Sequence, residues 1–124
     1  MLSPTRTIEI FQTQPGPQSF TQGETIFNEG ENGSVMYGVL EGEVNLVINN
    51  QVVETILTGD VFGEGALVDP NRLRASTAIA KTDCKLAVLN LERFLFVVQE
   101  TPLFALNVMR SMSDRLRHLK HSAD

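Results

Sequence analysis

Short hydrophobic runs, separated by glycine and polar residues, make up most of the chain before residue 90. The runs are rich in β-branched and aromatic residues, which is typical of short strands. Asn49 and Asn50 separate two of the runs, and asparagine tolerates the positive φ that a tight hairpin needs. Such closely spaced strands predict a small antiparallel barrel or jelly roll. The expected strands are 25–28, 36–40, 44–48, 52–57, 75–80 and 85–89.

The pattern changes to a helical period after residue 90. Asn90 is suited to cap a helix over 91–100. Thr101 and Pro102 are suited to open a second helix, over about 103–120, because proline is favoured at the first helical position. We therefore expect a single domain over 1–124, with the barrel at about 18–90 and the C-terminal helices at about 91–120.

A weaker helical pattern lies near the N-terminus, at 5–14, and ends at a Pro-Gly-Pro sequence. Its hydrophobic residues are expected to cover an edge of the core: Ile8, Ile10 and Phe11.

One face of the predicted final helix carries hydrophobic residues spaced by three, four and three positions: Met109, Met112, Leu116 and Leu119. This spacing matches the seam of a two-helix coiled coil and favours a homodimer, with the barrel helping to hold it. A face buried within the same chain is the alternative. Phe104 and Val108 lie to one side and are expected to pack on the barrel.

The balance of charge argues against one class of partner. The chain carries 15 acidic and 10 basic residues, for a formal net charge of −5 at pH 7. General binding to nucleic acid relies on clustered lysine and arginine, so we expect none here. The basic residues of the last helix are interpreted as a solvated face, with a basic edge toward a ligand phosphate or an acidic partner as the alternative. They are Arg110, Arg115, Arg117 and Lys120.

Cysteine and histidine are too scarce for most catalytic or metal centres. Cys84 is the only cysteine, so no disulfide is expected, and its place in a predicted strand indicates a buried, unreactive thiol. His118 and His121 both lie near the end of the chain, away from the barrel. We therefore expect no metal, no cofactor and no enzyme activity.

The N-terminal sequence lacks the basic start and apolar run of a signal peptide. No apolar stretch reaches the roughly 20 residues of a membrane span, so we expect a cytoplasmic protein without membrane contact.

Two adjoining segments carry the residue types that suit a small anionic ligand with sugar hydroxyls. Backbone N–H groups at a glycine-rich turn that opens a helix bind phosphate oxygens. An arginine offers a two-pronged charge to the same phosphate, and a carboxylate accepts hydrogen bonds from ribose hydroxyls. The candidate binding residues are Phe62, Gly63, Glu64, Gly65, Ala66, Leu67, Arg72, Arg74, Ala75 and Ser76.

The order of these segments resembles the cyclic-nucleotide-binding domain family, in particular the sensory half of the CRP/FNR-type bacterial regulators. The resemblance covers about 20–120 and includes a series of glycine turns ahead of the candidate site. The segment 59–67, with Arg74-Ala75-Ser76, resembles the family's phosphate-binding cassette, and 112–117 resembles its dimerising helix. The resemblance implies a jelly-roll β-barrel followed by that helix.

The resemblance also implies roles for the cassette residues. Glu64 would hold the ribose 2′-hydroxyl, Arg74 would pair with the cyclic phosphate, and the N–H groups of Gly65 and Ala66 would complete the phosphate cradle. The alternative for Glu64 is a carboxylate that caps the following turn. The alternative for Arg74 is an exposed charge at a strand edge.

Three positions depart from the cAMP-binding regulators. Ala75 follows the arginine where those proteins often have a hydroxyl residue. Leu119 and Lys120 occupy the helix positions at which the cAMP-binding regulators present a Thr-Ser pair to adenine. Arg72 is an additional arginine, and two residues that are two positions apart on a strand point the same way.

These departures favour a cyclic dinucleotide such as cyclic di-GMP slightly over cAMP, because paired arginines in a two-fold dimer match two phosphodiesters. Ordinary loop charge at Arg72 is the alternative. Arg115 and Leu119 are candidate ligand contacts from the final helix.

CRP-type regulators carry a helix-turn-helix domain after this helix, and this sequence ends at Asp124 without one. We expect the ligand signal to pass to a protein partner such as a transcription regulator. Truncation of a longer protein is another explanation for the missing domain. A ligand-independent dimeric scaffold of the same fold is the alternative function.

Overall fold

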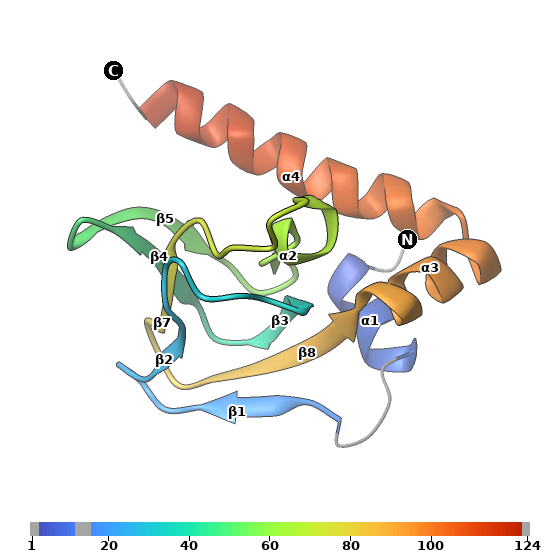
Figure 1. The fold of residues 1–124 in the computed structure, drawn as a ribbon, viewed down its shortest axis with the longest axis horizontal. Helices are drawn as coiled ribbons and strands as arrows, with labels where there is room; N and C mark the ends of the chain where they lie inside the picture. The colour runs from blue at the N-terminus through green and yellow to red at the C-terminus, as the bar shows by residue number, and fades with distance from the viewer. Residues whose placement is uncertain (1–2, 12–15, 123–124) are drawn as a thin grey trace.

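The chain folds into two antiparallel four-stranded sheets with helices on one side (Figure 1). The computed structural model describes residues 3–11 and 16–122. One sheet has the order β1 (Gln18–Phe20), β8 (Cys84–Asn90), β3 (Val35–Glu41) and β6 (Val61–Phe62). The other has the order β2 (Thr25–Phe27), β7 (Thr77–Ala80), β4 (Val44–Ile48) and β5 (Gln51–Ile56). This arrangement is a jelly roll of two open sheets, and its strands do not close into one barrel.

Four helices complete the described part of the fold: α1 (Pro4–Phe11), α2 (Gly65–Val68), α3 (Leu91–Glu100) and α4 (Leu103–Ser122). α1 packs against β3, β8 and α4, whereas the short α2 lies next to β3. α4 contacts α1, α3 and β6, and its C-terminal half extends above β5 (Figure 1). α4 therefore lies against the strand that leads into α2.

The core divides into two hydrophobic clusters. One lies between the two sheets and is rich in aromatic residues, among them Phe27, Tyr37 and Phe62. The other lies between the sheet of β3 and β8 and the helices, and it includes Ile8 and Phe104. Because Phe62 of β6 belongs to the first cluster and Val61 to the second, this two-residue strand joins them.

Most elements agree with the expectations from sequence, and two strands were not predicted. Val44–Ile48 and Leu91–Glu100 have the expected bounds, and the other predicted strands and the last helix agree within two residues at each end. The missed strands, β1 and β6, are three and two residues long, too short for a hydrophobic pattern. The N-terminal helix ends at Phe11, and the rest of its predicted range, 12–15, lies outside the described residues.

The predicted turn and cap have the expected geometry. Asn49 and Asn50 have φ angles of 52° and 62°, which give the left-handed turn between β4 and β5. The side chain of Asn90 accepts a hydrogen bond from the backbone N–H of Arg93 at 2.8 Å and so caps α3.

The burial of the helices confirms some predictions and corrects others. Ile8 is fully buried, whereas Ile10 is 63% exposed and does not cover the core. Phe104 and Val108 of α4 are buried, as expected. Arg110, Arg117 and Lys120 of α4 are exposed, as predicted for a solvated face. Arg115 is largely shielded from solvent and does not belong to that face.

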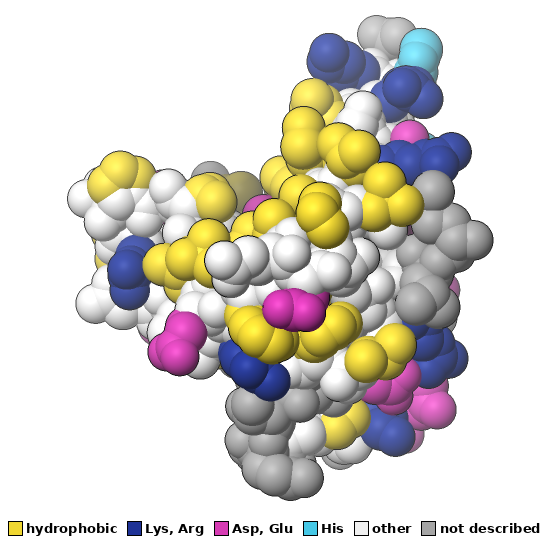
Figure 2. Space-filling model, turned by 90° about the vertical axis from the view of Figure 1, so that its right-hand side faces the viewer, with side chains coloured by type: hydrophobic (Ala, Val, Ile, Leu, Met, Phe, Trp, Pro, Cys, Tyr) yellow, Lys and Arg dark blue, Asp and Glu magenta, His cyan; other side chains and the backbone are white. Residues whose placement is uncertain are grey.

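The face of α4 next to its buried side is hydrophobic and largely exposed. Figure 2 shows a band of hydrophobic side chains that rises toward the basic C-terminal end of the molecule. The exposed members of the predicted seam are Met109, Met112 and Leu116, while Leu119 is half-buried. In this single chain the seam is therefore not buried within the fold.

Two further properties bear on function. Cys84 is buried, and desolvation raises the pKa of its thiol, so the thiolate is disfavoured. None of the helices formed by the described residues is long and apolar enough to cross a membrane.

Candidate functional site

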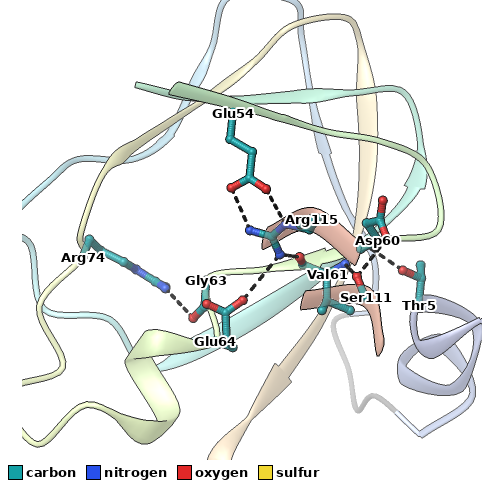
Figure 3. Close-up of polar contacts among 9 residues, drawn as sticks. All are labelled: Thr5, Glu54, Asp60, Val61, Gly63, Glu64, Arg74, Ser111 and Arg115. Atoms are coloured by element: carbon teal, nitrogen blue, oxygen red, sulfur yellow. Dashed lines mark hydrogen bonds and ion pairs between the residues drawn. The ribbon is translucent and has the colours of Figure 1, made fainter. Parts of the chain in front are cut away.

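The candidate site is built around the turn that joins β6 to α2. Gly63 adopts a φ of 76°, which favours glycine, and a Cβ there would lie 2.9 Å from Nη1 of Arg74. The backbone N–H of Ala66 donates to the carbonyl of Gly63 at 3.3 Å, and that of Leu67 donates to the carbonyl of Glu64 at 2.9 Å. The turn thus places the Glu64 side chain next to a carbonyl that Arg74 also contacts (Figure 3).

Arg74 is buried in the fold and is not the exposed strand-edge charge of the alternative interpretation. Only 6% of the residue is exposed. Its Nη1 donates to the carbonyl of Gly63 and its Nη2 to the carbonyl of Val35, each at 2.9 Å. The guanidinium carbon lies 4.0 Å from the centre of the Phe27 ring. Arg74 therefore spans from the cassette to β3 across the aromatic cluster.

The charge of Arg74 has no close counterion. No carboxylate of the described residues lies within 4.0 Å of its guanidinium, which is held by carbonyls and a ring face. Burial lowers the pKa of Arg74, and Tyr37, Glu31 and Glu64 offset only part of that effect. A buried cation held in this way is suited to pair with an incoming anion.

Gly33 makes room for this arrangement. A Cβ at position 33 would lie 2.5 Å from Cζ and Nε of Arg74 and 2.8 Å from the Cβ of Ala66. Gly33 also donates its backbone N–H to the carbonyl of Arg72 at 2.8 Å. The absence of a side chain at Gly33 is thus required for the observed position of Arg74. Sequence reasoning did not single out Gly33 because the contact joins residues 41 positions apart.

Glu64 presents an acceptor that the protein does not use. Its Oε1 is buried and accepts no hydrogen bond from the residues that the structure describes. Glu64 precedes α2 as its N-cap, but the side chain makes no capping hydrogen bond. The capping alternative is therefore wrong. The nearest cation is Arg115, whose Nη1 lies 3.7 Å from Oε1, beyond hydrogen-bond distance.

Arg115 joins α4 to two strands. Its Nε donates to Oε2 of Glu54 at 2.7 Å and its Nη2 to Oε1 of the same carboxylate at 3.0 Å. Its Nη1 donates to the carbonyl of Val61. Burial acts to lower the pKa of Arg115, but the hydrogen bond and charge of Glu54, together with Glu64 and Asp60, raise it overall. Arg115 is therefore a paired cation that links α4, β5 and β6 (Figure 3).

Glu54 is a site residue that sequence reasoning missed, and Asp60, although part of the cassette segment 59–67, was given no role of its own. Asp60 precedes β6, and its Oδ1 accepts a hydrogen bond from Ser111 of α4 at 2.8 Å. Thr5 of α1 donates to the backbone carbonyl of Asp60 at 3.2 Å. These contacts depend on how the helices cross the strands, and a single carboxylate in the sequence does not indicate them.

A cavity of about 500 Å³ lies beside this network, between β5 and α4. Its lining combines hydrophobic and polar residues of β5, among them Val52 and Glu54, with Asp114, Arg115, His118 and Leu119 of α4. Glu64 and Arg74 do not line it, whereas Asp60 of the cassette segment and Arg115 do.

The other predicted binding residues are distributed around the cassette. Phe62 and Ala66 are buried and Leu67 is half-buried, while Ala75 and Ser76 lie in the bend before β7, exposed and half-buried respectively. Arg72 is exposed with a φ of 56°, and the segment 72–74 is not a strand. The prediction that Arg72 and Arg74 point the same way is therefore wrong, because one points to solvent and the other is buried.

The described residues contain no group of three or more histidine, cysteine, aspartate or glutamate side chains arranged to hold a metal ion. Separately, Glu64 and Arg74 offer recognition by a carboxylate and a guanidinium.

Comparisons with known proteins identify the class. Residues 17–101 match the family described as "Cyclic nucleotide-binding domain", so the chain belongs to that family. The "Cyclic AMP receptor protein" of Thermus thermophilus is 31% identical over 103 residues, which cover 79% of this chain and 47% of that protein. The cAMP-activated global transcriptional regulator CRP of Pasteurella multocida is 26% identical over 117 residues, covering 90% of this chain and 56% of that protein.

Solved structures agree with this class. The Catabolite Activator Protein of Thermus thermophilus has a TM-score of 0.73 and 29% identity, over 96% of this chain and 56% of that chain. The c-di-GMP responsive global regulator CLP of Xanthomonas campestris has a TM-score of 0.81 over 97% of this chain and 61% of that chain. Its 18% identity supports the fold alone. The chain spans about half the length of the curated relatives that it matches.

Proposed function

We propose that this chain is a non-enzymatic receptor for a cyclic nucleotide. The observation that carries the proposal is the pair formed by Glu64 and Arg74 on either side of one peptide carbonyl. Glu64 has a buried oxygen that accepts no hydrogen bond from the described residues, and Arg74 is a buried cation without a close carboxylate. A ribose hydroxyl supplies the missing donor, and a cyclic phosphate supplies the missing anion.

The site favours a cyclic mononucleotide such as cAMP or cGMP. One carboxylate and one arginine match one ribose and one phosphate. The preference for cyclic di-GMP rested on Arg72 acting beside Arg74 and on the departures at Ala75, Leu119 and Lys120. Arg72 is exposed and has a left-handed backbone, which removes the support from paired arginines. Cyclic di-GMP is retained as a test ligand because one structural neighbour is described as responsive to it.

Arg74 can accept a phosphate without leaving its place in the core. A guanidinium has five N–H groups, and Arg74 directs two of its nitrogens at the carbonyls of Gly63 and Val35. The backbone N–H of Ala66 is bonded to Gly63, so its predicted part in the cradle requires the turn to open slightly. The proposal assigns phosphate charge to Arg74 and ribose recognition to Glu64.

The signal would leave the protein through α4. Three hydrophobic side chains of its seam are exposed, and we propose that they pair with a second copy in a homodimer. Arg115, which lies beside the seam, connects the helix to β5 and β6. A ligand-dependent shift of α4 would then be read by a protein partner such as a transcription regulator in the cytoplasm, without direct binding to nucleic acid.

Calorimetric titration of the chain with cAMP, cGMP, cyclic di-GMP and cyclic di-AMP tests this proposal. We expect one mononucleotide to bind at one per chain, and Glu64→Gln to weaken that binding about tenfold or more, since it replaces a charged acceptor. Tight binding of cyclic di-GMP at one per dimer would replace the mononucleotide assignment. Failure of all four to bind would refute the receptor function.

A ligand-independent dimeric scaffold is the second candidate function. The observation in its favour is that Arg74 already bonds two carbonyls and stacks on Phe27, which holds its charge without a ligand. The two functions differ in thermal stability, since a receptor is stabilised by saturating ligand and a scaffold is not. A Leu116→Glu variant that becomes monomeric would support the seam in either case, because the side chain is 55% exposed in the single chain.

A further inference from the structure

The arginine of α4 lies within ion-pair distance of two carboxylates, Glu54 and Glu64, and forms hydrogen bonds with Glu54 alone. Nε and Nη2 of Arg115 bind Glu54 at 2.7 and 3.0 Å in a two-pronged pair. Its Nη1 is directed to the carbonyl of Val61 and stays 3.7 Å from Oε1 of Glu64. Figure 3 shows the guanidinium between the two carboxylates, with the planar pair facing Glu54.

Glu54 and Glu64 are both shielded from solvent, so a hydrogen bond from Arg115 to either of them is strong. The side chains of Glu54, Glu64 and Arg115 are 13%, 24% and 17% exposed. Charge-assisted hydrogen bonds are stronger in such surroundings than in water. An arginine that bonded Glu64 in the same way would occupy the oxygen that is now without a donor.

We propose that Glu54 is a positioning residue that keeps Glu64 available to a ligand hydroxyl by holding Arg115 away from it. The inference rests on the proposed function for its ligand, a nucleotide with a free ribose hydroxyl. Glu54 itself touches no ligand in this scheme. It sets the affinity for the ribose because Arg115 and the hydroxyl compete as donors to the same Glu64 oxygen.

The competition predicts a specific effect of Glu54→Gln. The amide no longer pairs with the arginine as a charge, so Arg115 turns to Glu64. Binding of cAMP then weakens about tenfold, because the ribose hydroxyl must displace a charged donor. Binding of 2′-deoxy-cAMP stays within about twofold of the wild-type value, because that nucleotide makes no hydrogen bond to Glu64.

The double variant Glu54→Gln/Arg115→Met provides a second test. Without the arginine there is no competing donor, so the preference for cAMP over 2′-deoxy-cAMP returns to the wild-type ratio. Glu43→Gln is the matched control, since Glu43 pairs with Lys81 away from α4, and it should leave both affinities unchanged. Restoration by a second substitution is not expected if Glu54→Gln merely loosens the packing of α4.

The experiment is calorimetric titration of the full chain and these variants with cAMP and 2′-deoxy-cAMP. Selective loss of cAMP affinity in Glu54→Gln, reversed in the double variant, supports the inference. Equal loss of both nucleotides, or tighter binding of both, overturns it, because Arg115 would then act through packing or on the phosphate.

A ligand-free measurement separates this inference from the proposed function. Double-mutant cycles with Arg115→Met and Glu64→Gln, followed by urea unfolding, give the coupling between Arg115 and Glu64 in the wild-type chain and in the Glu54→Gln variant. We expect the coupling to rise about tenfold, as an equilibrium constant, when Glu54 is replaced. A wild-type chain that binds no nucleotide refutes the receptor function, and unchanged coupling refutes the role of Glu54.

Discussion

Arg74 and Arg115 lie on two sides of Glu64, and they differ in whether a carboxylate pairs with their charge. Arg74 is held by carbonyls and an aromatic ring, and burial lowers its pKa. Arg115 is paired with Glu54, and although burial acts against it, the carboxylates raise its pKa. A cation without a counterion attracts an anion, whereas a paired cation joins parts of a structure. The difference favours Arg74 as the ligand contact and Arg115 as the connection to α4.

The two regions also differ in what they join. Arg74 connects the cassette to β3 inside the aromatic cluster, where no helix takes part. Arg115 connects α4 to β5 and β6, and Ser111 of the same helix bonds Asp60 close by. A ligand that pulls on Glu64 would act on the first region through the Gly63 carbonyl and on the second through Arg115. The variants below separate these two roles.

Replacement of Arg74 should have the largest effect, and on binding. Arg74→Met removes the cation that would meet the phosphate, so we expect cyclic-nucleotide affinity to fall about 100-fold or more. The free energy of unfolding should fall by less than about 2 kcal/mol, because methionine fills the space and only two carbonyls lose a donor. Calorimetry and urea unfolding measure the two effects.

Arg6→Met is the matched control for Arg74→Met. Its side chain is 58% exposed and pairs with Glu9 on α1, so both measurements should stay near wild type. Retained affinity in Arg74→Met would show that the phosphate is bound elsewhere, and the contrast between Arg74 and Arg115 would lose its functional meaning.

Replacement of Arg115 should act mainly on stability. Arg115→Met leaves the shielded carboxylate of Glu54 without its partner, and we expect the free energy of unfolding to fall by about 2 kcal/mol. The figure lies below that of a fully buried pair because both side chains retain some exposure. Urea unfolding checks it.

Arg117→Met, two residues further along α4, is the control for Arg115→Met. Arg117 is 69% exposed and lies 3.8 Å from Asp114, so its loss should change the unfolding free energy by about 0.5 kcal/mol or less. Equal effects of the two variants would mean that the Glu54–Arg115 pair does not hold α4 to the sheet.

The sequence was sufficient for the local features and insufficient for the contacts between distant elements. The short strands, the asparagine hairpin and the Asn90 cap follow from neighbouring residues, and so does the glycine turn before α2. Glu64 and Arg74 were singled out by residue type and by resemblance. Neither source gave the inward direction of Arg74, which depends on space at Gly33.

Arg72 is a residue for which a local sequence rule gave a wrong prediction. The strand rule that made it a partner of Arg74 assumes extended backbone, and Arg72 has a φ of 56° in a loop. Glu54 was missed because its partner lies 61 residues away on a helix whose path over β5 is set by packing. Contacts of this kind are tertiary and have no local pattern.

Gly33→Ala should disturb the Arg74 region alone, with a smaller effect. The added Cβ would lie 2.5 Å from the Arg74 guanidinium, so the arginine must shift. We expect about a tenfold loss of nucleotide affinity and about 1–2 kcal/mol of stability from overpacking.

Gly38→Ala provides overpacking of the same kind away from Arg74. Its Cβ would lie 2.7 Å from Oγ1 of Thr5, on the α1 side of β3. Titrations at a temperature where both variants are folded should show lost affinity only for Gly33→Ala. Equal losses would indicate that overpacking in general, not the position of Arg74, governs binding.

The smallest expected effect is on the ionisation of Tyr37, the only tyrosine in a chain without tryptophan. Burial raises the pKa of Tyr37, and the nearby charge of Arg74 partly offsets this while Glu31 adds to it. Because the folded state favours the neutral phenol, its contribution to stability is complete below the ordinary pKa of about 10. The contribution is lost as the pH rises above that value.

Removing the offsetting cation should raise the pKa of Tyr37 further. The ultraviolet absorbance of the phenolate reports this residue alone, so a pH titration of the folded chain can compare the variants directly. We expect the midpoint to move upward in Arg74→Met and to stay in place in Arg115→Met, because only Arg74 lies over the Tyr37 ring, 5.8 Å from its centre. Equal midpoints in the wild-type chain, Arg74→Met and Arg115→Met would mean that a partner other than a ligand neutralises the charge of Arg74. Arg74 would then be a paired cation like Arg115.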